Sequence, residues 1–247
     1  MQDYLTIREV SLRLGVSVDT LRRWDRKGYF PAIKKGPRGH RFYPKQQVDA
    51  YMRDIFAEAK KWVMGELSLQ NIPQDQYCEN SGIFQMRSAR FQQELASRKE
   101  LEKIYPLILA VVGEIGNNSF DHNLGNWPED VGIFFAHDLV RGYVVLADKG
   151  QGILKTLKRI RPDLASHEDA LRVAFTEVIT GRSPENRGNG LKFVKKVVQA
   201  EHMELFFYSG DAVVQIKTAQ ADIKIASSSL EFRGCLAFLK FYMDTQV

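Results

Sequence analysis

The sequence predicts an α+β protein with a small all-α head and a larger part of layered helices and strands. The first fifty residues read as short helical segments separated by glycine turns. Further along the chain, amphipathic helical stretches alternate with apolar, strand-like runs. Positive charge is concentrated at the start, because residues 1–53 carry a net +7 and the remaining 194 residues carry −2. A small basic module of this kind favours a polyanionic partner, usually DNA or RNA.

The totals indicate a soluble globular protein. Hydrophobic residues make up 44% and charged residues 26% of the 247 positions, which is enough for a sizeable core. Cys78 and Cys235 lie far apart in the sequence, so we expect no disulfide framework and a reducing compartment. The longest apolar stretches, such as residues 104–112, are too short to cross a bilayer, and no signal-peptide run opens the chain. We therefore expect a cytoplasmic protein without a membrane partner.

Two helices are predicted at the start of the head. Thr6 is expected to cap the first, with Glu9 as its capping-box partner, and Gly15 to end it. Ser17 is expected to cap the second helix, and Gly28 to stop it. The pattern is helix, tight turn, helix.

A wing and a further helix follow. The run FPAIKKGPRGHRFYP is rich in glycine and proline and predicts a short hairpin. A helix is expected from Pro44 to about Met64. The predicted division is a head over 1–64, a polar linker over 65–83 and a second domain over 84–247.

Cationic and polar side chains of the second helix and the wing are candidates for reading DNA, since they can reach phosphates and base edges. Trp24 has apolar helical neighbours and is expected to be core. The DNA-binding candidates are Ser17, Thr20, Arg22, Arg23, Arg26, Arg38, His40, Arg41 and Tyr43.

These residues carry a resemblance to a known family. YLTIREVSLRLGVSVDTLRRWDRKGYF followed by GHRFY resembles the winged helix-turn-helix of the MerR superfamily, closest to its excisionase-like branch, over about residues 4–53. The resemblance implies DNA binding and transcription regulation, with Arg22 and Arg23 on the recognition helix and Arg41 and Tyr43 at the wing. The alternative is a winged helix reused for protein contacts. No long dimerisation helix is evident after residue 53, and a homodimer is left open.

The second domain is predicted to contain helices, strands and a helical loop region. An apolar stripe that includes Ile108, Val111 and Ile115 marks the longest helix. The expected elements are helices over 84–103 and 104–124, the strands VGIFFAHDL and GYVVLAD, a mixed helical and loop stretch over 153–187, a helix over 190–200, and the short strands MELFFYS, AVVQIKT, DIKIASS and CLAFLKFYM.

Three separated motifs suggest a nucleotide pocket. Glu114 and Asn118 lie one helical turn apart, so a carboxylate and an amide could orient a water and hold Mg²⁺ together with phosphate oxygens. Asp148 ends an apolar strand and precedes two glycines in DKGQG, where a buried carboxylate needs a donor such as the adenine amino group. The third motif, GNGLK from Gly188, opens a helix whose free N–H groups favour phosphate. A polar surface face, a glycine turn and a plain loop are the structural alternatives.

Together the three motifs resemble the N, G1 and G2 boxes of the GHKL ATPases over about residues 104–243. The late run FRGCLAF resembles a further box, with Cys235 where threonine is usual. The resemblance implies a Bergerat-type α/β sandwich, a mixed β-sheet layered on helices, with ATP and Mg²⁺ as cofactors. No P-loop, dinucleotide fingerprint or protein kinase signature set is present in the sequence.

The resemblance also implies residue roles. Glu114 would be the general base, Asn118 the magnesium ligand and Asp148 the acceptor for adenine, while the stretch from Ile153 to Arg187 would form a lid. Lys192, Arg182 and Arg187 would lie near the phosphates. The cofactor-binding candidates are Asn118, His122, Asp148, Gly150, Gly152, Gly188, Gly190, Leu191 and Lys192.

The leading hypothesis is a DNA-binding regulator in which slow ATP hydrolysis or ATP sensing switches the head. An anti-sigma-like serine kinase acting on a partner protein encoded nearby, and a module that holds nucleotide without cleaving it, are the alternatives. A sensor histidine kinase fits less well, because none of the five histidines lies between residues 41 and 121. A DNA-processing role lacks a second catalytic domain in this sequence.

Overall fold

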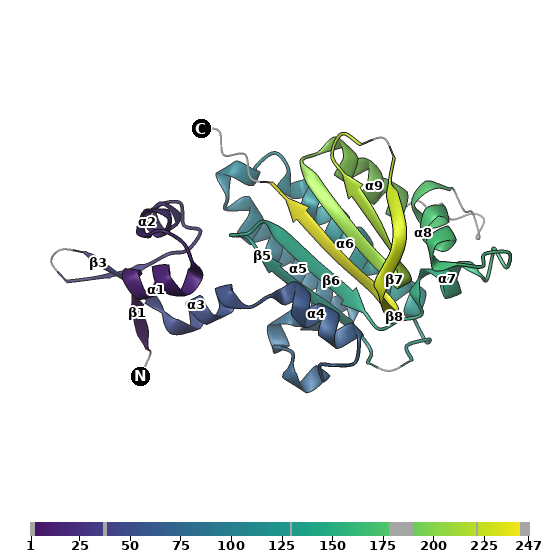
Figure 1. Cartoon of the computed structure of the whole chain (residues 1–247), viewed down its shortest axis with the longest axis horizontal. Coiled ribbons are helices and arrows are strands. Elements are labelled where there is room, and N and C mark those ends of the chain that lie inside the picture. The colour runs from purple at the N-terminus through teal and green to yellow at the C-terminus, as the bar shows by residue number, and fades with distance from the viewer. Residues whose placement is uncertain (1–2, 37–38, 129, 178–189, 221, 243–247) are drawn as a thin grey trace. The chain divides into compact units, whose positions relative to one another are not determined.

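The computed structural model describes residues 3–36, 39–128, 130–177, 190–220 and 222–242 (Figure 1). The chain divides into two compact units. The first unit, called the head, contains Met1–Asp54 and Asp138–Arg141. The second unit, called the body, contains Ile55–His137 and Gly142–Val247.

The two expected helices of the first unit are present. Helix α1 spans Ile7–Leu14 and α2 spans Val18–Arg26. Thr6 and Glu9 form the expected capping box, and Ser17 caps α2 by accepting a hydrogen bond from the N–H of Thr20. Gly15 adopts a left-handed φ of 66°, which allows the tight turn between the helices.

The head also contains a small antiparallel sheet in the order β1-β3-β2, whereas an all-α head with a wing was expected. Its strands are β1 Tyr4–Thr6, β2 Ile33–Lys35 and β3 His40–Pro44, and α3 follows at Lys45–Met52. Strands β2 and β3 form the predicted wing, and β1 adds a third strand to it. The core of the head consists of Val10, Leu21, Phe30, Tyr43 and Val48, with Trp24 packed against them as expected.

The boundary between the units falls earlier than the sequence suggested. The helix expected from Pro44 to Met64 is interrupted, because Arg53 is extended with ψ 135°. Helix α4 spans Ile55–Val63 and belongs to the second unit. Ile55 and Trp62 of this helix are buried in a cluster with strand residues of the body, and this burial places α4 there.

Residues 65–83, expected to be a linker, are also part of the body. They include two 3₁₀ turns, Leu69–Asn71 and Gln74–Gln76, and the short strand β4 at Tyr77–Cys78. Strand β4 pairs with β5 and forms one edge of the main sheet.

The main sheet has five strands in the order β4-β5-β6-β8-β7. Its longer strands are β5 Ile133–Asp138, β6 Tyr143–Asp148, β7 Met203–Lys217 and β8 Lys224–Phe241. The pairs β4–β5, β6–β8 and β7–β8 are antiparallel, whereas a mixed sheet was expected. The four short runs expected at the end of the chain are merged into β7 and β8, with the register shifting around Gly210. The bulge preserves the pairing where the sequence alone suggested a break.

Helices cover both faces of this sheet, so the fold is the expected α+β class with a layered body (Figure 1). On β5, Phe134 packs with α4, while its neighbour Phe135 contacts Phe84 and Phe91. Successive strand residues point to opposite faces, so α4 and the helix carrying Phe84 lie on different sides. The remaining helices are α5 Ser81–Ala96, α6 Tyr105–Asn123, α7 Gly152–Leu157, α8 His167–Thr176 and α9 Gly190–Ala200.

Candidate functional site

Helix α6 carries the first motif along one flank. The apolar stripe of α6, which includes Ile108 and Val111, is buried and fixes the orientation of the helix. Glu114 and Asn118 lie on the edge of that buried stripe and are partly exposed. Both side chains therefore have solvent access while their backbone is held by the core.

Asp148, at the end of β6, is the most distinctive polar group of the body, with only 2% of its surface exposed. The Ser119 hydroxyl donates to its Oδ2 at 2.8 Å, and the Gly150 N–H donates to its Oδ1 at 2.8 Å. Burial raises the pKa of Asp148 to about 6, and these hydrogen bonds offset only part of that effect. The carboxyl group is thus desolvated. It is held in one orientation by α6 and by the glycine loop, which is the segment of residues 149–152 that follows β6.

The glycine loop after β6 packs closely against Asn123. A Cβ atom on Gly150 would lie 2.0 Å from Asn123 Nδ2, so only glycine fits without a shift. The Gln151 N–H donates to Asn123 Oδ1 at 2.8 Å. Sequence reasoning missed both Asn123 and Ser119. The available signal was their spacing, since each lies one residue beyond a predicted site residue on the same helix.

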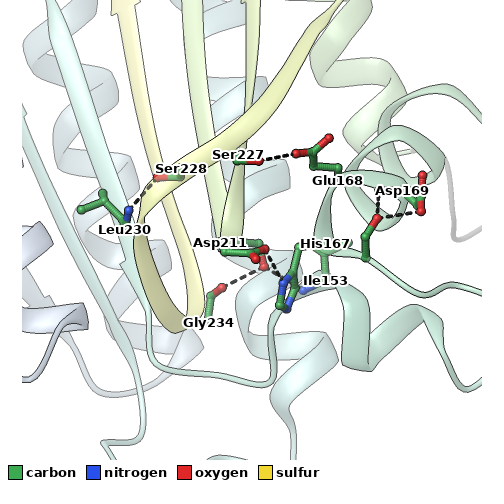
Figure 2. A network of polar contacts seen from close by, with 11 residues as sticks. Ile153, His167, Glu168, Asp169, Asp211, Ser227, Ser228, Leu230 and Gly234 are labelled. Atoms are coloured by element: carbon green, nitrogen blue, oxygen red, sulfur yellow. Dashed lines mark hydrogen bonds and ion pairs between the residues drawn. The ribbon is translucent and has the colours of Figure 1, made fainter.

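Gly152, the second glycine of the loop, lies against β7 and β8. Gly152 has a left-handed φ of 74°, and a Cβ there would lie 3.1 Å from Ser209 Oγ. Ser209 accepts from the Ile153 N–H at 3.0 Å and donates to the Gly234 carbonyl at 3.0 Å. Figure 2 shows Ile153 and Gly234 in this network of polar contacts. Ser209 is a further residue that sequence reasoning missed, because no motif includes it.

Cys235 pairs with Asp148 in the β6–β8 register and donates from Sγ to Ser209 Oγ at 3.8 Å. Burial raises the pKa of its thiol well above the ordinary value, and the charge of Asp148 acts in the same direction. The thiol is therefore a packed, neutral group beside the carboxylate.

Gly190 brings the third motif against the first. A Cβ atom on Gly190 would lie 1.6 Å from Glu114 Oε1, so the start of α9 lies directly on the Glu114 side chain. Leu191 is partly buried. The predicted residues Gly188, Arg182 and Arg187 lie outside the described residues.

Lys192, expected to lie near the phosphates, is partly buried in the first turn of α9. Its ammonium donates to the carbonyl of Glu177, the residue that follows α8. Burial lowers the pKa of Lys192, which the Glu177 carboxylate partly counteracts. The contact joins the start of α9 to the end of α8.

His122, expected among the cofactor-binding residues, lies in the last turn of α6. The residue is exposed, and its carbonyl oxygen accepts from Gln151 Nε2 at 2.9 Å. Arg159 in turn donates to Gln151 Oε1 at 2.6 Å. What this position supplies to the glycine loop is its backbone, because α6 is in its last turn there.

A cavity of about 670 Å³ lies next to the glycine loop. It shares Gln151, Gly152, Ser209 and Gly234 with the loop and its supports, but Glu114, Asn118 and Asp148 do not line it. His167, which does line it, pairs with Asp211 at 2.7 Å (Figure 2). The cavity therefore includes part of the second motif, and none of the predicted residues Glu114, Asn118 and Asp148.

Magnesium is implied by the resemblance of the first motif. Among the described residues, no group of three or more His, Cys, Asp or Glu side chains is arranged to hold a metal ion. Asn118 offers one amide oxygen, so the site fits Mg²⁺ only when phosphate oxygens and waters complete the coordination. The residues are compatible with an ion that arrives with a nucleotide.

In the head, α2 presents cations to solvent. Arg23 and Arg26 are exposed, and neither has an ion-pair partner among the residues that the structure covers. Arg22 is paired with Asp19 at 2.9 Å, and Thr20 shares a hydrogen bond with the capping Ser17. Arg23 and Arg26 are therefore the α2 cations most available to a phosphate backbone.

Two predicted wing contacts have structural roles instead. Tyr43 is fully buried in the head core, stacked on Phe30, so it cannot reach DNA from this position. Arg41 is only 22% exposed and donates to Asp25 at 2.6 Å, which ties β3 to α2. The resemblance placed both residues at the wing, but alternate residues of a strand face the core, and Arg41 and Tyr43 lie on that side of β3. His40 is exposed, and Arg38 lies outside the described residues.

Comparison with known proteins identifies the head. Residues 6–43 match the family described as MerR family regulatory protein, so the head is a MerR-type helix-turn-helix domain of the DNA-binding, regulatory kind. No curated protein matches the chain. No helix among the described residues is both long and apolar enough to span a membrane.

Proposed function

We propose that the protein is a DNA-binding regulator whose body binds ATP with Mg²⁺, and that the bound nucleotide switches the affinity of the head for DNA. The head supplies the DNA-binding part, because residues 6–43 are of the MerR type. The body supplies the ligand-responsive part. Coupling between two such modules in one chain requires only that the nucleotide favours one of two states with different DNA affinity.

The observation that carries the nucleotide proposal is the environment of Asp148. A desolvated carboxylate is costly unless donors satisfy it, and here the Ser119 hydroxyl and the Gly150 N–H each occupy one oxygen. The Cys235 N–H and the Asn123 side chain also form hydrogen bonds to this carboxylate, although each carboxylate oxygen can accept more than one hydrogen bond. An exocyclic amino group on a purine is a donor of the right kind to engage it. The structural alternative is a packing carboxylate at a tight turn, and ligand binding distinguishes the two.

The contact between Gly190 and Glu114 supports a phosphate end for the same pocket. Helix α9 begins at Gly190 beside the Glu114 carboxylate, and the first turn of a helix offers N–H groups that have no partner within the helix and favour phosphate. In this proposal Asn118 holds the magnesium that accompanies the nucleotide, and Glu114 accepts a proton from the attacking water. Mg²⁺ would supply charge neutralisation to the phosphates.

The first test of the whole proposal is calorimetric titration with ATP and Mg²⁺, followed by DNA binding with and without them. Nucleotide binding together with a changed DNA affinity supports the switch. Nucleotide binding with unchanged DNA affinity rejects the switch, and absence of nucleotide binding rejects the pocket. Transfer of the terminal phosphate to a separate protein would instead identify a protein kinase.

Replacing Glu114 with glutamine is expected to preserve nucleotide binding and slow hydrolysis by about 100-fold, because the amide cannot accept the proton from water. Phosphate release in single-turnover assays measures the change. The matched control is Glu102→Gln, at an exposed carboxylate before α6. Unchanged hydrolysis in Glu114→Gln would remove this residue from the reaction.

Replacing Arg23 with alanine is expected to weaken DNA binding about tenfold and to reduce the salt dependence of the affinity by about one counterion. Fluorescence anisotropy at several salt concentrations measures both quantities. Lys45→Ala, which removes an exposed cation from the start of α3 instead, is the comparison variant. Equal effects of the two substitutions would mean that only net charge matters.

A further inference from the structure

Lys149, which lies between Asp148 and Gly150, directs its side chain away from the candidate site. Its ammonium lies 2.9 Å from Asp130 Oδ2, and only 11% of the side chain is exposed. The preceding carboxylate of Asp148 is directed toward Ser119 of α6. Because consecutive side chains of an extended chain point to opposite sides, one short segment contacts two different layers of the body.

The same carboxylate oxygen of Asp130 also binds α4. It accepts a hydrogen bond from Trp62 Nε1 at 3.3 Å, and the Lys149 ammonium lies 5.4 Å from the centroid of the Trp62 ring. Trp62 is fully buried in the cluster between α4 and the sheet. Each pair among Lys149, Asp130 and Trp62 therefore interacts, and we call these three residues the triad. The triad joins the glycine loop to α4 and to the segment that follows α6.

Stability alone does not account for this triad. Removing a lysine and an aspartate from water costs free energy, and apolar side chains of similar volume often stabilise such a position equally well. A charged pair differs from an apolar contact in its directionality, because it fixes the relative positions of the elements that it joins. Here it fixes the glycine loop relative to α4.

Helix α4 is also the first element of the body after the head. Helix α3 ends at Met52, and α4 begins at Ile55. Only two residues therefore separate the last helix of the head from the helix that Lys149 contacts. A change in α4 reaches the head through a very short length of chain.

We propose that Lys149 is a positioning residue that transmits nucleotide binding at Asp148 to α4, and through α4 to the DNA-binding head. The inference rests on the proposed nucleotide site and adds the route by which that site communicates. Ligand contact with the Asp148 side of the loop alters the backbone at Lys149, and the triad passes the change to Trp62. The ammonium of Lys149 itself contacts no nucleotide in this scheme.

The decisive variant is Lys149→Met, which keeps the length of the side chain and removes its charge. Calorimetry with ATP and Mg²⁺ is expected to give an affinity within about threefold of wild type, since Asp148 and its donors are unchanged. The ratio of DNA affinities with and without ATP and Mg²⁺ is expected to fall from at least about fivefold to below about twofold. Lys149→Arg, which retains the cation, is expected to restore part of the response.

Lys103→Met is the matched control, because Lys103, which precedes α6, is an exposed lysine of the same body without an ion-pair partner among the described residues. It is expected to leave both affinities unchanged. Circular dichroism and thermal unfolding verify that each variant is folded. An Asp130→Asn variant that reproduces the Lys149→Met phenotype, with no further loss in the double variant, would show that both residues act through one contact.

Tryptophan fluorescence gives a readout that does not depend on DNA. The sequence has three tryptophans, so Trp24→Phe and Trp127→Phe leave Trp62 as the only emitter. Nucleotide is expected to change the Trp62 emission in this background. The change is expected to be lost when Lys149→Met is added, although calorimetry still detects binding.

The outcomes separate this inference from the function on which it rests. If wild type binds no nucleotide, the proposed function fails and the inference fails with it. If wild type binds nucleotide and Lys149→Met retains the full DNA response and the Trp62 emission change, the route through Lys149 is wrong while the nucleotide site stands. Loss of both responses with binding intact supports the route.

Discussion

Replacing Asp148 with asparagine is expected to weaken nucleotide binding by about 10–100-fold, the cost of one unsatisfied buried polar contact. An asparagine has one acceptor oxygen, and the Gly150 N–H would engage it, as it now engages Oδ1. The remaining group is then an amide NH₂, a donor facing a donor on the purine. Calorimetric titration with ATP and Mg²⁺ measures the loss.

The same substitution is expected to stabilise the fold at neutral pH. Burial raises the pKa of Asp148 from its usual 3.8 to about 6, so the folded state holds a proton that the unfolded chain has released between these values. Stability contributed by this group is therefore present below about pH 4 and is lost as the pH rises to about 6. Asparagine stays neutral, so the free energy of unfolding at pH 7 should rise by about 1–3 kcal/mol, with no difference at low pH.

Urea denaturation at pH 4 and pH 7 measures the free energy of unfolding and tests the predicted effect of Asp148→Asn on stability. The control is Asp222→Asn, the same chemical change at an exposed position of the body, which should alter neither nucleotide binding nor the pH dependence. A variant that is more stable at pH 7 but binds nucleotide as wild type does would contradict the role of Asp148 while leaving its burial intact. Weaker binding together with lower stability would point to general damage instead.

Replacing Gly234 with alanine is expected to lower the free energy of unfolding by about 3 kcal/mol or more. Gly234 has φ 105°, in the region that residues with a side chain rarely adopt. A Cβ atom there would also lie 1.9 Å from the Asp148 carbonyl oxygen, a backbone atom that cannot move without displacing β6. Strain and clash act together where β8 meets the glycine loop.

Chemical denaturation followed by circular dichroism measures the effect, with Gly113→Ala as the matched control. Gly113 lies in α6, and a Cβ atom there meets nothing within 4 Å, so alanine should stabilise the helix by about 0.5–1 kcal/mol. Opposite signs for the two substitutions are the expected result. A Gly234→Ala protein as stable as wild type would show that the strand end is far more adaptable than its packing indicates.

Much of the fold could be predicted from the sequence because its signals are local. Thr6 and Ser17 mark helix starts, because each side chain accepts a hydrogen bond from the N–H group three residues further on. The turn at Gly15 and the glycine loop after β6 depend on backbone freedom, which a single residue type supplies. The long helix carrying Glu114 follows from the spacing of its apolar residues.

The candidate site was predictable only in part. Motif spacing selected Glu114, Asp148 and Gly190, and the structure brings Gly190 against Glu114. Motif spacing did not select Ser119 or Ser209, because their hydrogen-bond partners lie 29 and 56 residues away in the chain. The MerR resemblance placed Tyr43 at the wing as a DNA-binding candidate, although the residue is buried.

The sequence by itself determined the capped helices of the head, the longer helices of the body and the positions of the three body motifs. Only the tertiary structure decided that α4 belongs to the body, that Arg41 is bound to Asp25, and that Lys149 contacts Trp62. The physical reason is the distance along the chain between the residues that interact. Capping, turn formation and amphipathicity involve neighbours in the chain, whereas burial and ion pairing depend on which distant segments come together.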